Sequence, residues 1–180
     1  MKMMIASDIH GSALYCGKLL ERFDKEGCER LILLGDLLYH GPRNALPDGY
    51  DPPKVAEMLN ARKDKLLCVR GNCDAEVDQM VLHFPIRADY AVMPIGSRLM
   101  YITHGHLFED GTTLPLPKGD IFLFGHIHVP KCEEKDGIMR LNPGSVSMPK
   151  ENSARGYMTL ENNLFTWKTL DGETFKTWQA

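Results

Sequence analysis

The sequence predicts an α/β fold in which two β-sheets pack face to face, with helices outside them. In the first half, short apolar runs alternate with amphipathic stretches in the order strand, helix, strand, helix, strand, which is typical of a parallel sheet with right-handed crossovers. In the second half, strand-like segments are joined by hairpin turns, which indicates antiparallel pairing. The length of 180 residues suits one domain with a sizeable core, so residues 1–180 are expected to form a single domain.

The first half is expected to contain three strands and two helices. Residues 3–6 are a short apolar run, as a buried strand requires. Ser12 is a suitable N-cap for the first helix, and Gly27 is suited to end it. The loop at residues 39–53 is rich in Pro, Gly, Asp and Asn and has no periodicity. The remaining elements are strands at residues 31–34 and 66–69 and a helix at about residues 53–62.

In the second half, the sequence favours a series of strands. Residues 90–93 and 98–103 flank Ile95-Gly96-Ser97, which favours a hairpin. The pairs Asn162-Asn163 and Asp171-Gly172 favour two-residue hairpin turns near the C-terminus. The other strands are expected at residues 121–124, 138–141, 157–161, 164–170 and 174–178.

Metal-binding side chains follow the apolar runs, often beside a glycine. Asp8 and His10 come just after the first run, and on an extended backbone residues i and i+2 point the same way. The same pattern recurs after four later runs, so we expect the strand ends to build one site along one edge of a sheet. The candidate ligands are Asp8, His10, Asp36, Asn72, His104, His126 and His128.

Seven ligands are too many for one tetrahedral zinc ion, but they fit two adjacent divalent ions that share one carboxylate. Mixed imidazole and carboxylate donors suit Mn, Fe, Zn, Co or Ni better than Ca or Mg. Two such ions can hold a hydroxide between them and clamp the attacking and leaving oxygens of a phosphoryl transfer. The set therefore predicts a hydrolase that acts on phosphoesters.

The order of these motifs resembles the calcineurin-like metallophosphoesterases. The chain has Asp-x-His, Gly-Asp, Gly-Asn, His and Gly-His-x-His in turn, and together they span residues 8–128. It is also similar to the small bacterial phosphodiesterases of the YfcE type, through segments such as Thr103-His-Gly-His106 and Asn142-Pro-Gly-Ser145. The resemblance implies a four-layer αββα sandwich, with two central mixed β-sheets flanked by helices.

The resemblance also implies how the ligands are divided. Asp8, His10 and His128 would hold one ion. Asn72, His104 and His126 would hold the other, and Asp36 would bridge the two. Mn is the metal expected first, with Zn, Fe, Ni and Co as alternatives. Asp36, Asn72 and His106 are expected to be catalytic.

The implied activity is phosphodiester hydrolysis by a metal-bridging hydroxide. Two alternatives use the same site, namely phosphomonoester hydrolysis and nucleotide pyrophosphate cleavage. A third is a scaffold like the retromer subunit that keeps this fold, although a scaffold would be free to lose ligands that this chain retains.

Cys73 departs from the family pattern. Many members have a histidine directly after the Gly-Asn motif, where it serves as a general acid, and a thiol is a poor substitute at neutral pH. The proton could come from His106 or His40 instead, or the leaving group could depart unprotonated. Cys73 is nevertheless expected to face the substrate.

The long loop after the second strand is expected to form part of the substrate pocket. Loops of this length in a compact domain are usually functional. Residues 39–50 begin three positions after Asp36, whose carboxylate is the proposed bridging ligand. His40, Arg43 and Asn44 are suited to phosphate oxygens. The alternative is a solvent-facing loop with incidental polarity.

Two further segments have open interpretations. Asp74 could accept a hydrogen bond from a ligand histidine or could cap a following helix. Residues 142–145 could be a simple turn or could close the metal site from below.

Composition limits the partners. The net charge of −3, without a basic excess, gives no reason to expect a stable nucleic-acid partner, and the apolar runs are too short to cross a membrane. The five cysteines are scattered, with no C-x-x-C pair, and no signal peptide is apparent, which favours a cytoplasmic protein with reduced thiols. The expected partner is a small-molecule phosphoester substrate, and a homo-oligomer is compatible with the sequence.

Overall fold

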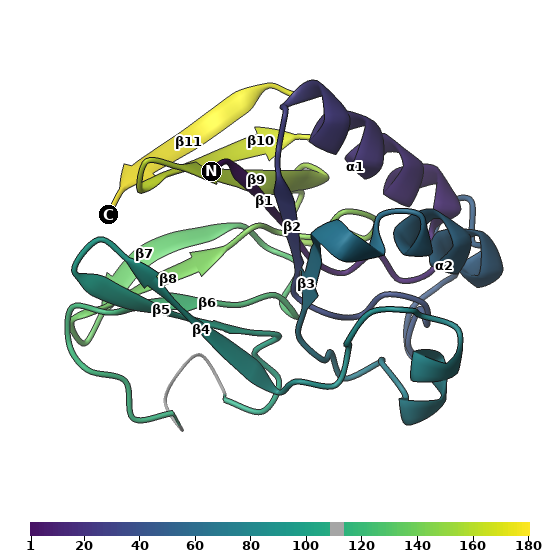
Figure 1. The fold of residues 1–180 in the computed structure, drawn as a ribbon, viewed down its shortest axis with the longest axis horizontal. Helices are drawn as coiled ribbons and strands as arrows, with labels where there is room; N and C mark the ends of the chain where they lie inside the picture. Colours follow the sequence, from purple (N-terminus) through teal and green to yellow (C-terminus); the bar gives the residue numbers. More distant parts are fainter. Residues whose placement is uncertain (109–113) are drawn as a thin grey trace.

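Two mixed β-sheets packed face to face form the centre of the computed structural model, which describes residues 1–108 and 114–180 (Figure 1). The six-stranded sheet has the order β11-β10-β9-β1-β2-β3, and the five-stranded sheet has the order β4-β5-β6-β8-β7. The strands are β1 (Met3–Ala6), β2 (Arg30–Leu33), β3 (Leu66–Cys68), β4 (Tyr90–Ile95), β5 (Arg98–Thr103), β6 (Ile121–Leu123), β7 (Lys131–Lys135), β8 (Ile138–Asn142), β9 (Gly156–Glu161), β10 (Leu164–Thr169) and β11 (Thr174–Gln179).

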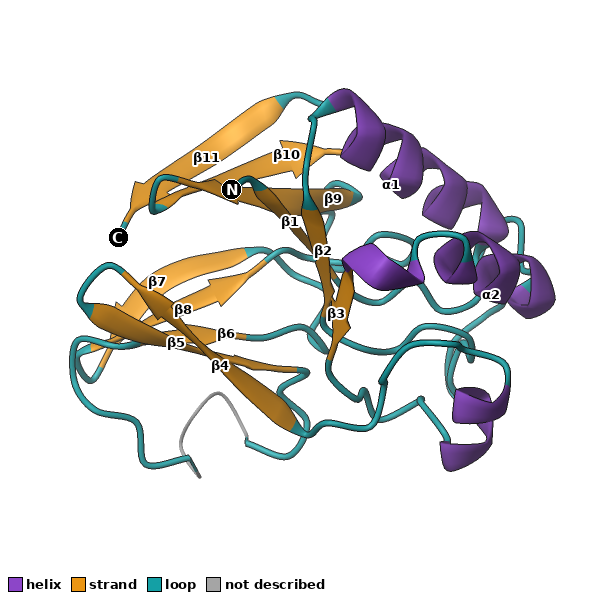
Figure 2. Ribbon diagram, in the orientation of Figure 1, coloured by secondary structure: helices purple, strands orange, loops and turns teal. Residues whose placement is uncertain are grey.

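Two α-helices cover the outer face of the six-stranded sheet (Figure 2). Helix α1 (Ala13–Lys25) begins at Ser12, whose hydroxyl accepts a hydrogen bond from the Tyr15 amide, as the sequence predicts. Helix α2 (Pro52–Asn60) is capped in the same way by Asp51. Two short 3₁₀ helices, Lys63–Lys65 and Glu76–Met80, complete the helical elements of the described residues.

The space between the sheets is a second apolar core. Ile5 and Ile32 of the six-stranded sheet pack with Met100 and Ile121 of the five-stranded sheet. Trp167 is fully buried in this core, and its indole N–H donates to the Asn142 carbonyl at 2.7 Å. Burying these side chains from both sheets holds the two sheets in a fixed relation, so that the loops at their edges are held too.

The predicted α/β class with two mixed sheets is confirmed, but the sheets do not correspond to the two halves of the chain. Strand β1 is central: it pairs with β2 in parallel and with β9 in antiparallel orientation. The C-terminal hairpins therefore complete the first sheet. Turn chemistry identifies neighbours within a hairpin, but not the sheet that the hairpin joins.

Two details differ from expectation. Strand β7 was not predicted, because its sequence KCEEK has charged residues instead of an apolar run, which is a common property of edge strands. No α-helix of residues 1–108 and 114–180 covers the outer face of the five-stranded sheet, so both flanking helices lie on the other sheet. Pro115 and Pro117 lie in the segment before β6 and lack the amide hydrogens that a helix interior uses.

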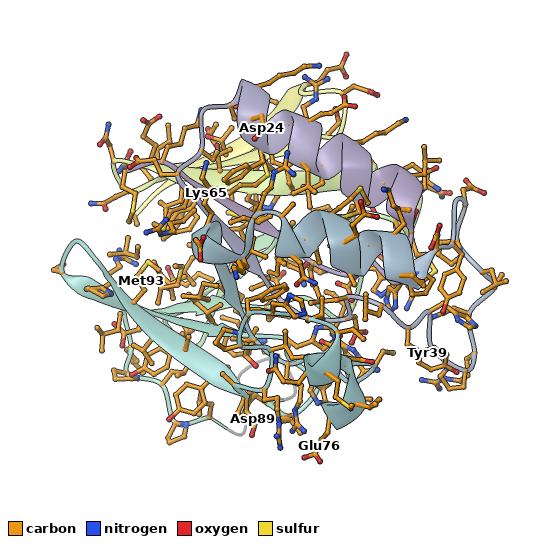
Figure 3. All side chains as sticks on the ribbon, turned by 45° about the vertical axis from the view of Figure 1, so that its right-hand side comes forward. Asp24, Tyr39, Lys65, Glu76, Asp89 and Met93 are labelled. Atoms are coloured by element: carbon orange, nitrogen blue, oxygen red, sulfur yellow. The ribbon has the colours of Figure 1, made fainter. Side chains whose placement is uncertain are left out.

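The connections that follow β1, β2, β3, β5 and β6 carry all seven candidate ligands. Tyr39, in the connection after β2, lies at the opposite side of the molecule from Met93 of β4 (Figure 3). The candidate site is therefore built from loops of both sheets, at the edge where these five strands end.

Candidate metal centre

Five of the candidate ligands have an unusual backbone conformation. Asp8, His10, Asp36, His126 and His128 all have positive φ angles, between 49° and 65°. A left-handed conformation is uncommon for non-glycine residues, and such residues cluster at functional sites. The extended backbone assumed in the sequence argument is therefore wrong: β1 ends at Ala6, and the ligands sit in tight turns beyond the strands.

Backbone hydrogen bonds between neighbouring turns hold these conformations. The Asp8 amide donates to the Gly35 carbonyl at 3.2 Å, and the His10 amide donates to the Asp36 carbonyl at 2.8 Å. The turn after β1 is thus joined to the turn after β2. Because the two turns support each other, the side chains of Asp8, His10 and Asp36 are held in a fixed relation.

Glycine is required where the turns touch. A β-carbon on Gly71 would lie 2.0 Å from the Asp36 carboxylate, and one on Gly125 would lie 2.0 Å from the Ser7 hydroxyl. Both contacts are closer than real side chains allow. The glycines before Asn72 and His126 therefore bring those ligands against the turns that carry Asp36 and Asp8.

Asp8, His10 and His128 converge on one point. The two Nε2 atoms of His10 and His128 are 3.2 Å apart. The Asp8 carboxylate lies 3.2 Å from His128 Nε2 and 3.6 Å from His10 Nε2. All three side chains are buried, so they form a compact group of donor atoms.

The backbone fixes which ring nitrogens point into this group. His10 Nδ1 donates to the Tyr39 carbonyl at 2.8 Å, His128 Nδ1 to the Met148 carbonyl at 2.6 Å, and His104 Nδ1 to the Leu34 carbonyl at 2.7 Å. Since a carbonyl only accepts, each Nδ1 carries the hydrogen, and a neutral ring presents a lone pair at Nε2. Such carbonyl partners are typical of metal-binding histidines.

Asn72, His104 and His126 form a second group. The His104 Nε2 atom lies 3.0 Å from the Asn72 side-chain oxygen, and the rings of His104 and His126 are 5.1 Å apart. Unlike His104, both Asn72 and His126 are exposed to solvent. The second group is therefore more open than the first.

Asp36 lies between the two groups. Its Oδ2 atom is 3.6 Å from His10 Nε2 and 3.4 Å from His104 Nε2. Its Oδ1 atom accepts from the Cys73 amide at 2.8 Å. One carboxylate oxygen thus faces a histidine of each group, which is the position required of a shared ligand.

The chemistry of these donors fits divalent cations. Asp8 Oδ1 is buried without a hydrogen-bond partner, and the facing lone pairs of His10 and His128 cannot bond to each other. Burial opposes a positive charge on His104, but the Asp36 and Asp8 carboxylates nevertheless raise the pKa of His104 to about 9. The buried cluster therefore favours positive charge at this position, and cations coordinated by the Nε2 atoms would supply it.

Asp74 supports the site through the backbone, which neither of its sequence interpretations anticipated. Its carboxylate accepts from the amides of Asp36, Leu37 and Gly71, at 2.8, 2.8 and 2.7 Å. It holds the turn that carries Asp36 against the turn that carries Asn72. It contacts no ligand side chain in these bonds, so its role is to position the backbone.

Residues 142–147 support the site from beneath. The hydroxyls of Ser145 and Ser147 donate to the Asp8 carbonyl at 3.0 and 2.9 Å. The side-chain amide of Asn142 donates to the Gly125 carbonyl at 2.7 Å. Of the two interpretations of residues 142–145, the structure favours the one that closes the site, and it adds Ser147, which no sequence pattern indicated.

A cavity of about 300 Å³ opens over both ligand groups. Of the residues predicted to face the substrate, Arg43, Asn44 and Cys73 line it. His40 does not: its ring lies against those of Tyr39 and Tyr50, with centroids 4.8 and 5.3 Å away. Lys150 also lines the cavity and was missed, because it belongs to none of the motifs, although it follows the Asn142-Pro-Gly-Ser145 segment closely.

His106 and Cys73 flank the ligands with shifted acidities. His106 is half-buried, its ring centroid is 5.3 Å from that of His104, and burial together with His104 and His126 lowers its pKa to about 4. Burial and the Asp36 carboxylate raise the pKa of the Cys73 thiol to about 12. At neutral pH His106 is therefore a neutral imidazole and Cys73 a neutral thiol.

Comparison with known proteins links this geometry to phosphoester chemistry. Residues 1–163 match the family described as the Calcineurin-like phosphoesterase superfamily domain. The chain is 46% identical to the Escherichia coli phosphodiesterase YfcE over 174 residues, which cover 97% of this chain and 95% of that protein. It is also 27% identical to a probable metallophosphoesterase, YsnB, of Bacillus subtilis, with 95% of this chain and 91% of that protein covered.

Solved structures show the same likeness. The structure of YfcE, described as a phosphoesterase from E. coli, matches with a TM-score of 0.93 at 45% identity and covers 99% of this chain and 98% of that one. Vacuolar Protein Sorting 29 from Cryptosporidium parvum matches with a TM-score of 0.61 at 18% identity, covering 99% and 98%. The second likeness shows the fold alone. In the described part of the chain, no helix is long and apolar enough to cross a membrane.

Proposed function

Because the chain belongs to the calcineurin-like phosphoesterase superfamily, we propose that it is a metal-dependent phosphodiesterase that acts at a two-metal site. The name of YfcE, at 46% identity over nearly the full length, supports phosphodiesters as the substrate class. The observation that carries the proposal is the position of Asp36, with one oxygen 3.6 Å from His10 of the first group and 3.4 Å from His104 of the second.

Residues of each group would hold one ion. Asp8, His10 and His128 fit the first, Asn72, His104 and His126 the second, and Asp36 both. Divalent ions held there would lower the pKa of a bound water molecule and neutralise charge on the phosphoryl oxygens. The mixed nitrogen and oxygen donors suit Mn, our first choice, and also Zn, Fe, Ni or Co.

Side chains around the cavity would bind and orient the phosphoryl group. Arg43 and Lys150 line the cavity together with Asp36 and offer charge-assisted hydrogen bonds to phosphoryl oxygens. His106 lies beside the second ligand group as a neutral imidazole and can donate a hydrogen bond without carrying charge. Asn72 would orient the same oxygens through its amide.

The acidities of Cys73 and His106 favour substrates with good leaving groups. A thiol whose pKa is about 12 is a weak proton donor at neutral pH, and a neutral imidazole is weaker still. We therefore place esters of acidic alcohols, such as aryl esters, ahead of simple alkyl esters as substrates. The leaving oxygen would depart unprotonated or take its proton from solvent.

Phosphomonoester hydrolysis is the alternative that a specific observation favours. Arg43 and Lys150 place two positive charges at the cavity, and a dianionic monoester would benefit from both. The scaffold alternative has less support, because the likeness to Vacuolar Protein Sorting 29 extends only to the fold. The five unpaired cysteines are consistent with a reducing, cytoplasmic location, which we include in the proposal.

The test combines metal content with substrate preference. Protein purified without chelator and then reloaded with Mn should bind close to two ions per chain, as measured by elemental analysis. Its kcat/KM should be higher for bis(p-nitrophenyl) phosphate than for p-nitrophenyl phosphate, which has the same leaving group. Saturation at one ion per chain would disprove the bridging position of Asp36. A higher kcat/KM for p-nitrophenyl phosphate than for the diester would favour phosphomonoester hydrolysis instead.

A further inference from the structure

We propose that a second cavity beside the metal centre receives the ester arm that stays on phosphorus, and that it fits a planar aromatic arm such as a nucleoside. The inference rests on the proposed phosphodiesterase function and names the class of diester. This adjoining cavity has a volume of about 380 Å³. That volume is within the usual range for pockets that hold small organic ligands.

The adjoining cavity borders the metal cavity and shares lining residues with it. Asn44, His128 and Lys150 line both. His128 belongs to the first ligand group, so the boundary between the cavities passes beside a proposed metal ligand. A phosphoryl group bound at the ligands would therefore have one substituent directed past His128 and Lys150 into the adjoining cavity.

Segments that also position the metal ligands form the walls of the adjoining cavity. On one side, the Met148 carbonyl accepts from His128 Nδ1 at 2.6 Å, and the Lys150 amide donates to the His128 carbonyl at 3.1 Å. On the other side, the Asp48 carbonyl accepts from Ser12, the N-cap of α1, at 2.6 Å. Both walls are thus fixed relative to the ligands, as selection of one substrate arm requires.

The chemistry of the walls favours a flat aromatic group. Ala45, Leu46 and Pro47 from one segment face the same cavity as Met148 and Pro149 from the other. Leucine and proline side chains offer apolar contact area, and a thioether interacts favourably with aromatic rings. Leu46 lines the cavity and is 62% exposed, so its apolar side chain is accessible to a ligand there.

Arg155 and Lys150 add charged groups to the walls of the adjoining cavity. The Arg155 guanidinium lies 4.3 Å above the Tyr15 ring, and its Nε donates to the Ser147 carbonyl at 3.1 Å. These contacts hold the guanidinium in place, and the structure assigns no acceptor among residues 1–108 and 114–180 to its two terminal nitrogens. An aromatic arm with acceptor atoms, as a nucleobase has, would use them. Lys150, which also lines the metal cavity, would face the phosphoryl group.

The apolar walls favour the retained arm over the leaving group. A departing oxygen gains negative charge, and apolar surroundings do not stabilise that charge. The retained arm keeps its bond to phosphorus and gains only from contact. The cavity is accordingly expected to act on substrate choice while the bond-breaking chemistry stays at the metal ligands.

The experiment uses two diesters that share one leaving group. Mn-loaded protein is assayed with thymidine 5′-(p-nitrophenyl phosphate) and with methyl p-nitrophenyl phosphate, both of which release p-nitrophenolate. We expect the wild type to prefer the thymidine ester by about tenfold or more in kcat/KM, the size of effect that one apolar group can supply. Leu46→Ala should remove apolar contact, and Ala45→Phe should fill the cavity.

Each variant should lower kcat/KM about five- to tenfold for the thymidine ester and leave the methyl ester within about twofold. Leu164→Ala is the matched control, because Leu164 is a partly exposed leucine at the start of β10, far from the cavity. Isothermal titration calorimetry supplies a second readout. Thymidine 5′-monophosphate should lose affinity in both variants, whereas methyl phosphate should not.

The outcomes separate the two proposals. If the methyl ester is hydrolysed and the wild type shows no preference, or if both variants change the two esters equally, the adjoining cavity does not bind the retained arm and only this inference is overturned. If the metal-loaded wild type hydrolyses neither ester, the proposed function itself fails, and this inference fails with it.

Discussion

Two clusters of charged side chains, one partly buried and one buried, lie in different parts of the molecule and are built in opposite ways. Around Glu26, opposite charges pair: its carboxylate binds Lys168 and Lys2, the latter at 2.8 Å, and accepts from the Tyr157 hydroxyl at 3.0 Å. At the metal centre, lone pairs face lone pairs, and buried Asp8 Oδ1 has no partner. The charges of the Glu26 cluster are paired within the chain, whereas the donor atoms of the metal centre require cations from outside the chain.

This contrast separates a structural site from a functional one. Burial disfavours charge on Glu26, but its bonds to Lys168, Lys2 and Tyr157 outweigh burial and lower its pKa to about 2. That cluster stabilises the folded chain. The metal centre instead concentrates left-handed backbone and buried carboxylates, which cost stability and are retained for what they bind.

The largest expected effect is on activity, from Asp36→Asn. A neutral amide is a poor shared ligand for two cations, so we expect a loss of at least about a thousandfold in kcat/KM for bis(p-nitrophenyl) phosphate and fewer than two bound ions. Asp120→Asn provides a control, since Asp120 is also buried but bonds to the Leu99 amide in the other sheet. Activity like that of the wild type in Asp36→Asn would refute the two-metal arrangement.

The sequence identifies the seven candidate ligands because each follows an apolar run, and the structure brings all seven together. It does not predict the supporting contacts. Asp74 and Ser147 act on backbone groups, and a backbone partner leaves no pattern in one sequence. Lys150 reaches the cavity because the segment after β8 bonds to the turns after β1 and β6. The turns of the chain do not reveal that β9 pairs with β1, so this path could not be predicted.

Arg43→Ala tests the next level of the site, which is substrate contact without metal binding. Arg43 lines the metal cavity and has no carboxylate partner among the described residues, so it is available for phosphoryl oxygens. Its loss should remove about 1.5–3 kcal/mol of transition-state binding, the usual contribution of a hydrogen bond to a charged group. The measurement is kcat/KM together with metal content, which should stay at the wild-type value.

His40→Ala is the matched comparison for Arg43→Ala. His40 belongs to the same loop but packs between Tyr39 and Tyr50 and does not line the cavity. We therefore expect a smaller effect on kcat/KM than that of Arg43→Ala. Equal losses in the two variants would mean that the loop acts as a whole, through its conformation, and that Arg43 makes no specific contact.

Glu26→Gln tests the complete cluster and should affect stability without affecting kcat/KM. The folded-state pKa of Glu26, about 2, lies below its unfolded value of about 4.3. Ionised Glu26 therefore stabilises the fold at any pH above the unfolded pKa. This stabilisation is lost as the pH falls from about 5 towards 2. At pH 7 the variant should lose about 2 kcal/mol of unfolding free energy. This is less than the full pKa difference implies, because Lys2 and Lys168 are partly exposed and solvent screens their attraction to Glu26. Urea unfolding at pH 7, 5, 4 and 3 should show the difference shrinking below pH 5, and a constant difference would contradict this account.

Cys73→Ser is expected to have the smallest effect and to test whether the metal centre needs a proton donor from the chain. The thiol lines the metal cavity, and its pKa of about 12 keeps it protonated at neutral pH. Aryl leaving groups depart as stable anions, so kcat/KM for bis(p-nitrophenyl) phosphate should stay within about tenfold of the wild type, which corresponds to about 1.4 kcal/mol.

The sharper comparison for this position uses a poor leaving group. Cys73→His would place an imidazole beside Asp36 and should raise the rate for methyl p-nitrophenyl phosphate less than the rate for a dialkyl phosphate, because only the dialkyl ester needs its leaving oxygen protonated. Metal content must match the wild type in both variants, since the Cys73 amide bonds to Asp36 and a shift there would disturb the shared ligand. If fully metallated Cys73→Ser protein loses far more than tenfold in kcat/KM on the aryl diester, the thiol contacts the reacting group directly. The metal ligands and bound cations alone would then not account for the reaction, and the contrast with Glu26 would have to include Cys73.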